Sequence, residues 1–395
     1  MAFTSLLHTF AFYLTLINAT SLLPRTSSCR DVTFTVTGSA TGRSLVNPPL
    51  KLSDPGVTAA FFGQPVVANK ISGTYRIYGQ YCEPVIKLGR SAQTLDLLVH
   101  GITYDHRFWN GLEDVPSLSN IHATAAYLNG KGHSTLAIDR LGIGRSDHPD
   151  PVHVVQAPFQ VELYHDLISQ LRRRTTSGSI GMPTGWQKIS WVGHSYGSIL
   201  AAQVAAKYPN DLDALILTGI AKRRPELNDI PGLLENDFVQ ASEYDPQRFP
   251  PAVYSPGYLV TSSKRGRRNT FYSRPIVDFS PRLYDQDFDL KQTITLGEIA
   301  TEQIPVASSF AKPVYVITGQ QDAAFCGNGS RELGNPDCGS GATSALGAMK
   351  NFFPAVPSKD FDYFAQANAG HSHQIHYTAP AGFAKVIEFL SRRGL

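Results

Sequence analysis

From Trp191 to Gly197 the chain reads Trp-Val-Gly-His-Ser-Tyr-Gly, a Gly-x-Ser-x-Gly pattern centred on Ser195. An apolar stretch suited to a β-strand precedes it, and the apolar spacing of a helix follows over Ile199–Tyr208. A sharp strand-to-helix turn strains its central residue, and Gly193 and Gly197 relieve the crowding around it. The stretch therefore predicts an α/β fold with Ser195 as a nucleophile. An ordinary turn with Ser195 as a helix cap is the alternative interpretation.

Two partners for this serine follow later in the chain. A serine hydroxyl is a weak nucleophile at neutral pH and needs a base, which in turn needs an orienting acid. His371 lies between the last expected strand and the last expected helix and is the candidate base. Asp322 follows the apolar stretch Val314–Thr318 and is the candidate acid. Both loops are expected at the same sheet edge as Ser195, and the order Ser, Asp, His separates this fold from others that reach the same geometry.

Other residues in and near these loops are alternatives. His373 is a second candidate base, and Glu226 or Asp229 is an alternative acid. A purely structural role for His371 is a further alternative. His373 and His376 also suggest a metal site, but no carboxylate or cysteine accompanies them at ligand spacing. We therefore expect no metal and no cofactor.

The negative charge that develops on an attacked carbonyl oxygen needs donors placed in advance, a group called the oxyanion hole. Two backbone N–H groups are expected to form it. One belongs to Tyr196, which follows the nucleophile, and the other to Ile102 in the turn after the stretch Leu95–Val99. Gly101 would let the backbone approach the substrate closely, or it is simply a turn glycine.

Eight short apolar stretches alternate with helical patterns, which is the rhythm of a mostly parallel sheet flanked by helices. Helical spacing covers Val161–Arg173 and Ile199–Tyr208. A last helix is marked by apolar residues from Phe383 to Leu390, after the start signals Thr378 and Pro380. The expected strands are Asp31–Thr37, Thr74–Gly79, Leu95–Val99, Thr135–Asp139, Ile189–Val192, Ala214–Thr218, Val314–Thr318 and Phe361–Phe364.

The stretch from Ala221 to Ala311 breaks this rhythm, since it is rich in Pro, Tyr, Arg and Asp and shows no such strand pattern. We interpret it as a lid inserted between strands 6 and 7. A structureless loop of this length is uncommon, so helices are expected at Leu233–Ser242 and Thr293–Thr301. The expected divisions are a signal peptide at 1–19, a first core part at 20–220, the lid at 221–311 and a second core part at 312–395.

The composition is that of a globular protein with many loops: 395 residues, 42% hydrophobic and 17% charged, with 33 Gly and 26 Pro. A net charge of +3 from 35 basic and 32 acidic residues gives no reason to expect nucleic-acid binding. Basic runs at 172–174, 222–224 and 264–268 are expected to be solvated surface, with a dibasic processing site as the alternative for the last. The expected partner is a small-molecule substrate, and the sequence leaves the oligomeric state open.

The chain begins with an uncharged segment typical of a signal peptide. Residues 1–19 contain no Lys, Arg, Asp or Glu, and their apolar stretch ends at Asn18-Ala19. This stretch is shorter than the roughly 20 residues of a membrane-spanning helix, and no later segment is long enough. We therefore expect a secreted protein without stable membrane insertion.

Four cysteines in a secretory context suggest two disulfides rather than free thiols. Pairing Cys326 with Cys338 would close a small loop, and pairing Cys29 with Cys82 would tie the segment after the signal peptide to a strand. The order of the cysteines alone does not decide the pairing. Asn328, in Asn-Gly-Ser, is a glycosylation acceptor if the chain enters the secretory pathway.

These motifs resemble the α/β-hydrolase superfamily, in particular its fungal-type secreted serine hydrolases, over most of the chain. The resemblance implies a triad of Ser195, Asp322 and His371, with Ile102 and Tyr196 as the oxyanion hole. The lid is the part with the least resemblance. The motifs occur in the family's order as His100-Gly101, Asp139-Arg140-Leu141-Gly142-Ile143-Gly144-Arg145-Ser146, Gly193 to Gly197, Gly319 to Asp322, and Gly370-His371.

The identity of the nucleophile narrows the range of reactions that the chain is expected to catalyse. Relatives that open epoxides typically carry Asp where this chain has Ser195, whereas Ser favours acyl transfer. Cleavage of an ester, thioester or lactone through an acyl-enzyme is therefore the leading hypothesis. A fungal secondary-metabolism tailoring hydrolase, acting by epoxide opening or by polyketide release or cyclisation, is one alternative. A catalytically silent, hydrolase-like binding protein is the other. For the first alternative, the candidate donors in the lid are Tyr244, Tyr254, Tyr258, Tyr272 and Tyr284.

Overall fold

A computed structural model of the chain describes residues 28–84, 86, 93–112, 120–173, 181–222, 235–327, 337–339 and 341–395. The predicted signal peptide, the glycosylation candidate Asn328 and the alternative acids Glu226 and Asp229 lie outside these described residues.

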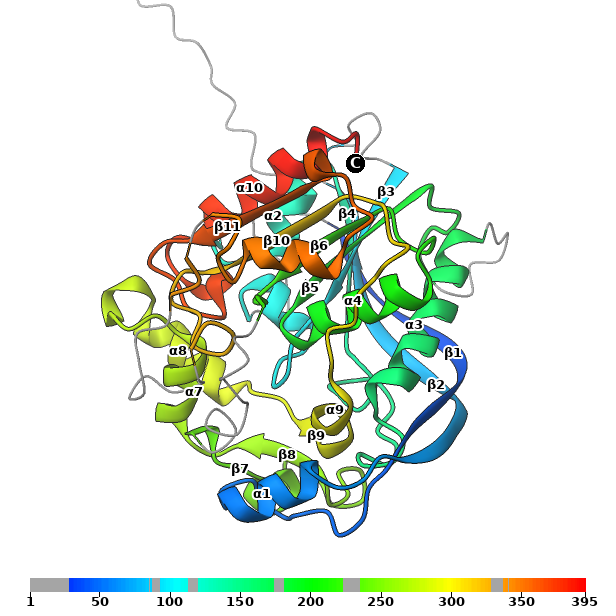
Figure 1. Ribbon diagram of the computed structural model, residues 1–395, viewed down its shortest axis with the longest axis vertical. Helices are drawn as coiled ribbons and strands as arrows, with labels where there is room; N and C mark the ends of the chain where they lie inside the picture. The colour runs from blue at the N-terminus through cyan, green and yellow to red at the C-terminus, as the bar shows by residue number, and fades with distance from the viewer. Residues whose placement is uncertain are drawn as a thin grey trace, which may run out of the picture.

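The core is one eight-stranded sheet with the order β1-β2-β4-β3-β5-β6-β10-β11 (Figure 1). Strand β2 is antiparallel to both neighbours, and every pair from β4 to β11 is parallel. All eight predicted strands are confirmed. The strands are β1 Cys29–Ser44, β2 Val67–Cys82, β3 Thr94–Val99, β4 Ser134–Ile138, β5 Lys188–His194, β6 Ala214–Thr218, β10 Val314–Gly319 and β11 Phe361–Gln366.

The first two strands are much longer than predicted. Each has 16 residues, and their outer halves pair only with each other. These halves, at 38–44 and 67–73, contain few large apolar side chains, so hydrophobic periodicity did not mark them.

Helices cover both faces of the sheet (Figure 1). One apolar cluster joins α3 and α4 to one face and includes Leu97, while the other joins α2 and α10 to the opposite face and includes Leu98. Adjacent residues of β3 thus point to opposite faces, and because both faces are buried the strand is apolar throughout. The predicted helices correspond to α3, α4 and α10. The helices outside the β6–β10 connection are α1 Pro55–Phe62, α2 Thr124–Gly130, α3 Ala157–Arg172, α4 Tyr196–Lys207 and α10 Ala379–Ser391.

The described residues also form five short 3-10 helices, of which η4 lies in the β6–β10 connection. They are η2 His106–Asn110, η4 Ile276–Asp278, η5 Gly347–Phe352, η6 Ser358–Asp360 and η7 His373–Ile375. Among all the helices that the structure describes, none combines the length and apolar character needed to cross a membrane.

The chain between β6 and β10 forms a small antiparallel sheet in the order β7-β8-β9, which corrects the expectation of no strands there. The strands have two to four residues each, too few for an alternating pattern to stand out. The elements are β7 Phe238–Gln240, α6 Ala241–Tyr244, β8 Tyr258–Thr261, α7 Lys264–Phe271, α8 Pro281–Asp289, β9 Ile294–Thr295 and α9 Leu296–Thr301.

The two helices predicted in this connection have different outcomes. The helix expected over 233–242 is wrong as one continuous helix: residues 235–236 and 241–242 are helical, but residues 238–240 between them form β7. The helix expected over 293–301 is largely confirmed as α9, although residues 294 and 295 form β9. Its start is fixed by a capping box, in which Thr295 and Glu298 each accept a hydrogen bond from the other's backbone N–H.

Part of the β1–β2 connection covers this small sheet. Leu52 and Phe61, the latter from α1, pack against Phe238, Leu259 and Ile294 in one buried cluster. Figure 1 shows α1 beside β7 and β8, although the two segments are far apart in the sequence. The residues after β6 are therefore tied to the N-terminal hairpin as well as to the core.

One predicted surface residue is buried. Arg267, in the basic run 264–268, is fully buried and pairs with the equally buried Asp287 through two hydrogen bonds of 2.8 and 2.7 Å. Its guanidinium also donates to the hydroxyl of Thr103 at 2.7 Å. The run was expected to be solvated because Lys and Arg are rarely buried without a partner, and the partner lies 20 residues further along the chain.

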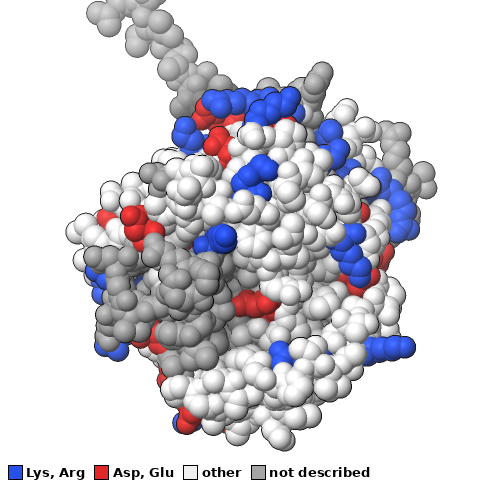
Figure 2. All heavy atoms as spheres, viewed as in Figure 1, with Lys and Arg blue, Asp and Glu red and all other residues white. Residues whose placement is uncertain are grey.

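The cysteines form the disulfides Cys29–Cys82 and Cys326–Cys338. The first joins the start of β1 to the end of β2, and the second closes a loop with a sequence separation of 12. On the face shown in Figure 2, basic and acidic side chains lie in small groups among a larger area of other residues.

Candidate active site

Ser195 lies at the turn between β5 and α4, at the carboxyl end of a central strand. Its φ of 52° and ψ of −117° form a strained conformation for a residue with a side chain. Its N–H donates to the carbonyl of Thr218 at 2.8 Å, which anchors the turn to β6. Its side chain makes no capping hydrogen bond to α4, contrary to the alternative that Ser195 is an ordinary helix cap.

Two glycines allow the chain to pack tightly around Ser195. A Cβ atom on Gly197 would lie 2.0 Å from the carbonyl oxygen of Val99, so only glycine lets α4 start directly against the end of β3. A Cβ on Gly101 would lie 2.8 Å from Cβ of Ser195. The backbone that follows β3 is thus in direct contact with the serine.

The structure brings His371 and Asp322 together. His371 Nδ1 donates to Oδ2 of Asp322 at 3.0 Å, and both side chains are almost fully buried. The same carboxylate accepts hydrogen bonds from the Thr318 hydroxyl at 2.6 Å and from the Phe325 N–H at 3.0 Å. These contacts fix the carboxylate and point it at the imidazole.

The charge state of Asp322 follows from these contacts. Burial by itself raises the pKa of a carboxyl group, but the positive charge and hydrogen bond of His371 lower it. The hydrogen bonds from Thr318 and Phe325 add to this effect, so the pKa of Asp322 lies below its usual value. Asp322 is therefore ionised at neutral pH.

The loop that carries His371 lies over the end of β5. The His371 ring is stacked against Phe271 and Phe325, with centroid distances of 5.5 and 5.7 Å. It lies 5.0 Å from the ring of His194, the residue before Ser195. Because β5, β10 and β11 run parallel, the loops with Ser195, Asp322 and His371 share one edge of the sheet.

The other histidines of this loop are held by main-chain and amide groups. His373 Nδ1 contacts Oε1 of Gln366 at 2.9 Å, and burial together with the charges of His376 and His371 lowers its pKa to about 3. His376 Nε2 accepts from the N–H groups of Ser273 and Gly370 at 3.0 and 3.3 Å. His373 thus contacts an amide oxygen where His371 contacts a carboxylate, so the geometry does not favour His373 as the base.

The two residues expected to form the oxyanion hole flank Ser195. Tyr196 is the first residue of α4, where backbone N–H groups are unpaired and the helix dipole favours negative charge. Ile102 lies in the turn after β3, directly after Gly101. Their role as donors remains a prediction.

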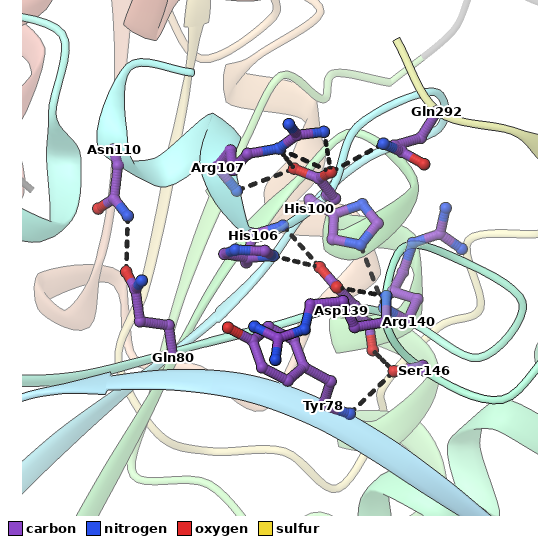
Figure 3. A network of polar contacts seen from close by, with 12 residues as sticks. Tyr78, Gln80, His100, His106, Arg107, Asn110, Asp139, Arg140, Ser146 and Gln292 are labelled. Carbon is purple, nitrogen blue, oxygen red and sulfur yellow. Dashed lines mark hydrogen bonds and ion pairs between the residues drawn. The ribbon is translucent and has the colours of Figure 1, made fainter. Parts of the chain in front are cut away.

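A polar cavity of about 830 Å³ lies outside this group of residues. Its wall includes Tyr78, His106, Asp139, Arg145 and Arg248, and none of the five residues proposed above lines it. Figure 3 shows a network of polar contacts on one side of this cavity.

Three residues of this network form the one cluster, among those the structure describes, whose ligand atoms lie close enough to hold a metal ion: Asp105, His106 and Asp139, within 4.8 Å of one another. Asp139 accepts from the side chain and the N–H of His106, both at 2.8 Å, and from the N–H of Arg145 at 2.9 Å. Asp105 is paired with Arg107 at 2.7 Å. The two carboxylates and Nδ1 of His106 are thus engaged by protein groups.

The sequence did not single out Arg140 and Glu298. Both are fully buried and form an ion pair between the loop after β4 and α9. Arg140 was noted only as part of the stretch Asp139–Ser146. A buried arginine has no signature in a single sequence when its carboxylate partner lies 158 residues away.

Several solved structures are similar to the chain at low sequence identity. A thermophilic esterase from Thermogutta terrifontis is 16% identical, with a TM-score of 0.49 over 82% of this chain and 95% of that one. The proline iminopeptidase of Mycobacterium smegmatis is 14% identical, with a TM-score of 0.46 over 81% and 96%. A monoacylglycerol lipase from Paleococcus ferrophilus is 16% identical, with a TM-score of 0.46 over 75% and 94%.

No curated protein sequence matches the chain. Residues 97–386, well over half of it, match the sequence profile described as the alpha/beta hydrolase family. This region runs from β3 to α10 and includes the turn with Ser195 and the His371–Asp322 pair. The chain therefore belongs to the alpha/beta hydrolase family.

Proposed function

We propose that the protein is a serine hydrolase that cleaves a carboxylic ester, thioester or lactone through an acyl-enzyme on Ser195. The observation that carries the proposal is the strained Ser195 at the β5–α4 turn, with φ 52° and no capping role. Such strain persists where the surrounding structure imposes it, and it is characteristic of a nucleophile at a strand-to-helix turn.

In this reaction His371 takes the proton of the Ser195 hydroxyl through Nε2 as the oxygen attacks the carbonyl carbon. Asp322 accepts the Nδ1 hydrogen bond at 3.0 Å, which sets the tautomer and stabilises the imidazolium that forms. The imidazolium then protonates the leaving alcohol, thiol or ring oxygen, and the acyl group stays on Ser195. Water, deprotonated by His371, attacks this ester, and the proton returns to Ser195.

The oxyanion donors of the proposal are the backbone N–H groups of Ile102 and Tyr196. The contact between Gly101 and Ser195 supports this role for Ile102, because the Gly101–Ile102 peptide lies beside the nucleophile. Each such donor is typically worth about 3 kcal/mol of the barrier.

No observation favours epoxide opening as a second function. The hydroxyls of three lid tyrosines that were candidate donors are used in the structure: Tyr258 donates to the Pro149 carbonyl, Tyr272 to Asp287 and Tyr284 to the Lys264 carbonyl. The segment 221–311 is proposed to act as the lid that selects the acyl group. The two disulfides support a proposed secreted location.

The first test is covalent labelling. The purified protein is incubated with a fluorophosphonate, digested and analysed by mass spectrometry; we expect the adduct on Ser195 alone. Ser195→Ala should take no label, whereas Ser169→Ala, a serine of α3 far from the site, should be labelled like the wild type. An unlabelled Ser195 in folded protein would overturn the proposal.

The second test is turnover. With p-nitrophenyl esters of graded chain length we expect Ser195→Ala to lower kcat at least about 10⁴-fold. A styrene-type epoxide serves as the competing substrate. Epoxide hydrolysis that survives in Ser195→Ala would show that the chemistry is not acyl transfer.

A further inference from the structure

One buried side chain contacts Tyr196 and the peptide that carries the N–H of Ile102. Arg140, the second residue after β4, has no exposed surface. Its Nη2 donates to the carbonyl oxygen of Gly101 at 3.2 Å. The same guanidinium lies over the ring of Tyr196, 4.7 Å from its centroid. Gly101 carries the carbonyl of the peptide whose N–H belongs to Ile102, so Arg140 bridges the two donor residues.

His100 adds a second hydrogen bond to the same carbonyl. Its Nδ1 donates to the Gly101 oxygen at 2.8 Å. Its Nε2 accepts the N–H of Arg140 at 3.1 Å, as Figure 3 shows. The Arg140 backbone thus fixes the tautomer that leaves a proton on Nδ1. Burial, with the nearby charge of Arg140, holds the pKa of His100 well below its usual value, so the ring stays neutral.

A peptide unit is planar and trans, so its C=O and N–H point in opposite directions. Two donors that hold the Gly101 oxygen therefore also fix the direction of the Ile102 N–H. A charged donor on the oxygen polarises the peptide and strengthens its N–H as a donor. The fixed direction and the polarisation both concern the Gly101–Ile102 peptide, which lies beside Ser195.

The arginine is itself held rigidly from the chain between β6 and β10. Glu298 of α9 accepts a hydrogen bond from Arg140 Nη1 and a second from Gln160 Nε2 at 3.0 Å. The other oxygen of Glu298 accepts the N–H of Thr295 at 3.1 Å in the capping box. A buried carboxylate with every contact satisfied gives the guanidinium a single position.

We propose that Arg140 is a positioning residue of the oxyanion hole, which orients the Gly101–Ile102 peptide and is held in place by Glu298. The inference rests on the proposed function, since it gives a role to donors that the acyl transfer needs. Arg140 touches neither substrate nor nucleophile and acts only through this peptide and Tyr196. A merely structural ion pair would instead stabilise the fold and leave turnover per active site unchanged.

The variant that tests this removes both charges together. Arg140→Met alone would leave Glu298 buried without its partner and destabilise the fold, so Arg140→Met is combined with Glu298→Gln. Arg140→Lys keeps the charge but lacks the forked geometry. The matched control is Arg172→Met, which removes an arginine that donates to the Asp211 carbonyl at 2.6 Å and to the Asp213 carboxylate at 2.8 Å. This pair lies at the opposite ends of β5 and β6 from Ser195.

Turnover of a p-nitrophenyl ester is measured per active site, titrated with the fluorophosphonate. For the double variant we expect kcat to fall about 10- to 100-fold with KM within about 3-fold. Arg140→Lys should lie between it and the wild type, and Arg172→Met should keep kcat within about 2-fold. The affinity for a trifluoromethyl ketone, which mimics the tetrahedral intermediate, should fall by the same factor as kcat/KM.

Two structural measurements test the role of Arg140 independently of activity. A crystal structure of the double variant should show the Gly101 carbonyl rotated, and the amide resonance of Ile102 should shift in the ¹H–¹⁵N spectrum. An unchanged peptide orientation, or unchanged kcat and ketone affinity in an active protein, would overturn the role of Arg140. A wild type that hydrolyses no ester and leaves Ser195 unlabelled would instead refute the proposed function, so the two failures are distinguishable.

Discussion

Two glycines, which have no side chain, determine how closely the backbone packs around Ser195. Gly101 lets the backbone after β3 approach Ser195, and Gly197 lets α4 start against the end of β3, each at a distance that a Cβ atom would prevent. Gly101 is not among the residues with positive φ, so its requirement is space alone. A substitution of Gly101 therefore tests how closely the backbone must approach Ser195.

We expect Gly101→Ala to lower kcat/KM about 10- to 100-fold, because its Cβ would lie 2.8 Å from Cβ of Ser195 and push the Ile102 peptide away. Ester hydrolysis and thermal unfolding are measured together. The control is Gly56→Ala in α1, where a Cβ would meet only a flexible aspartate side chain at 3.3 Å. Equal activity of Gly101→Ala and the wild type would show that the peptide is not part of the site.

At the scale of elements, the chain between β6 and β10 has one buried ion pair to the core and a second buried ion pair within itself. Arg140–Glu298 joins α9 to the loop after β4, and Arg267–Asp287 joins α7 to α8. Arg267 also reaches Thr103 in the turn after β3. The segment is therefore anchored on both sides of the turn that carries Ile102.

We expect Arg267→Met to lower the free energy of unfolding by about 3–5 kcal/mol, because it leaves the Asp287 carboxylate buried without its cation. The measurement is urea-induced unfolding. Arg265→Met, an exposed arginine of the same basic run, should change stability by less than about 0.5 kcal/mol. Adding Asp287→Leu to Arg267→Met should recover much of the loss. A cost below about 1 kcal/mol for the single variant would contradict the burial of this pair.

Across the whole molecule, buried histidines link stability to pH. Burial lowers the pKa of His148 to about 4 despite the opposing charges of Asp139 and Asp147, and it also lowers the pKa values of His100 and His194. The unfolded chain therefore binds protons near pH 6.5 that the folded protein binds only at lower pH. Stability is present above pH 6.5 and is lost as the pH falls.

The contribution of His106 to the pH dependence of stability has the opposite sign. Burial lowers its pKa, but the charge and hydrogen bond of Asp139 outweigh this and raise it. Its contribution is present below the unfolded pKa and is lost as the pH rises through the folded value.

We expect the free energy of unfolding to fall between pH 6.5 and 4, with a slope of up to about 1.4 kcal/mol per pH unit for each such histidine. His148→Phe should make this slope shallower while leaving the trend itself in place. The measurement is denaturant unfolding at half-unit pH steps, and the slope rather than the absolute stability is compared. A slope that His148→Phe leaves unchanged would show that this residue is not titrating against the fold.

The sequence by itself determined the eight strands, the three long helices and the turn at Ser195. These features depend on local properties, namely apolar stretches buried on both faces, helical spacing, and glycines around a strained serine. Ser195, Asp322 and His371 could be proposed because each directly follows a strand, and parallel strands end at one edge. The small sheet β7–β9 was not predicted, because strands of two to four residues are too short to show an alternation of apolar and polar residues.

Only the tertiary structure decided the partners of buried charges. Nothing in the sequence marks Arg267 or Arg140 as buried, since burial of an arginine depends on a carboxylate that folding brings close. The same holds for His371 against His373, which are two residues apart and differ only in that one meets Asp322 and the other Gln366. Pairing across long separations is a property of the packed chain, and a single sequence carries no local signal for it.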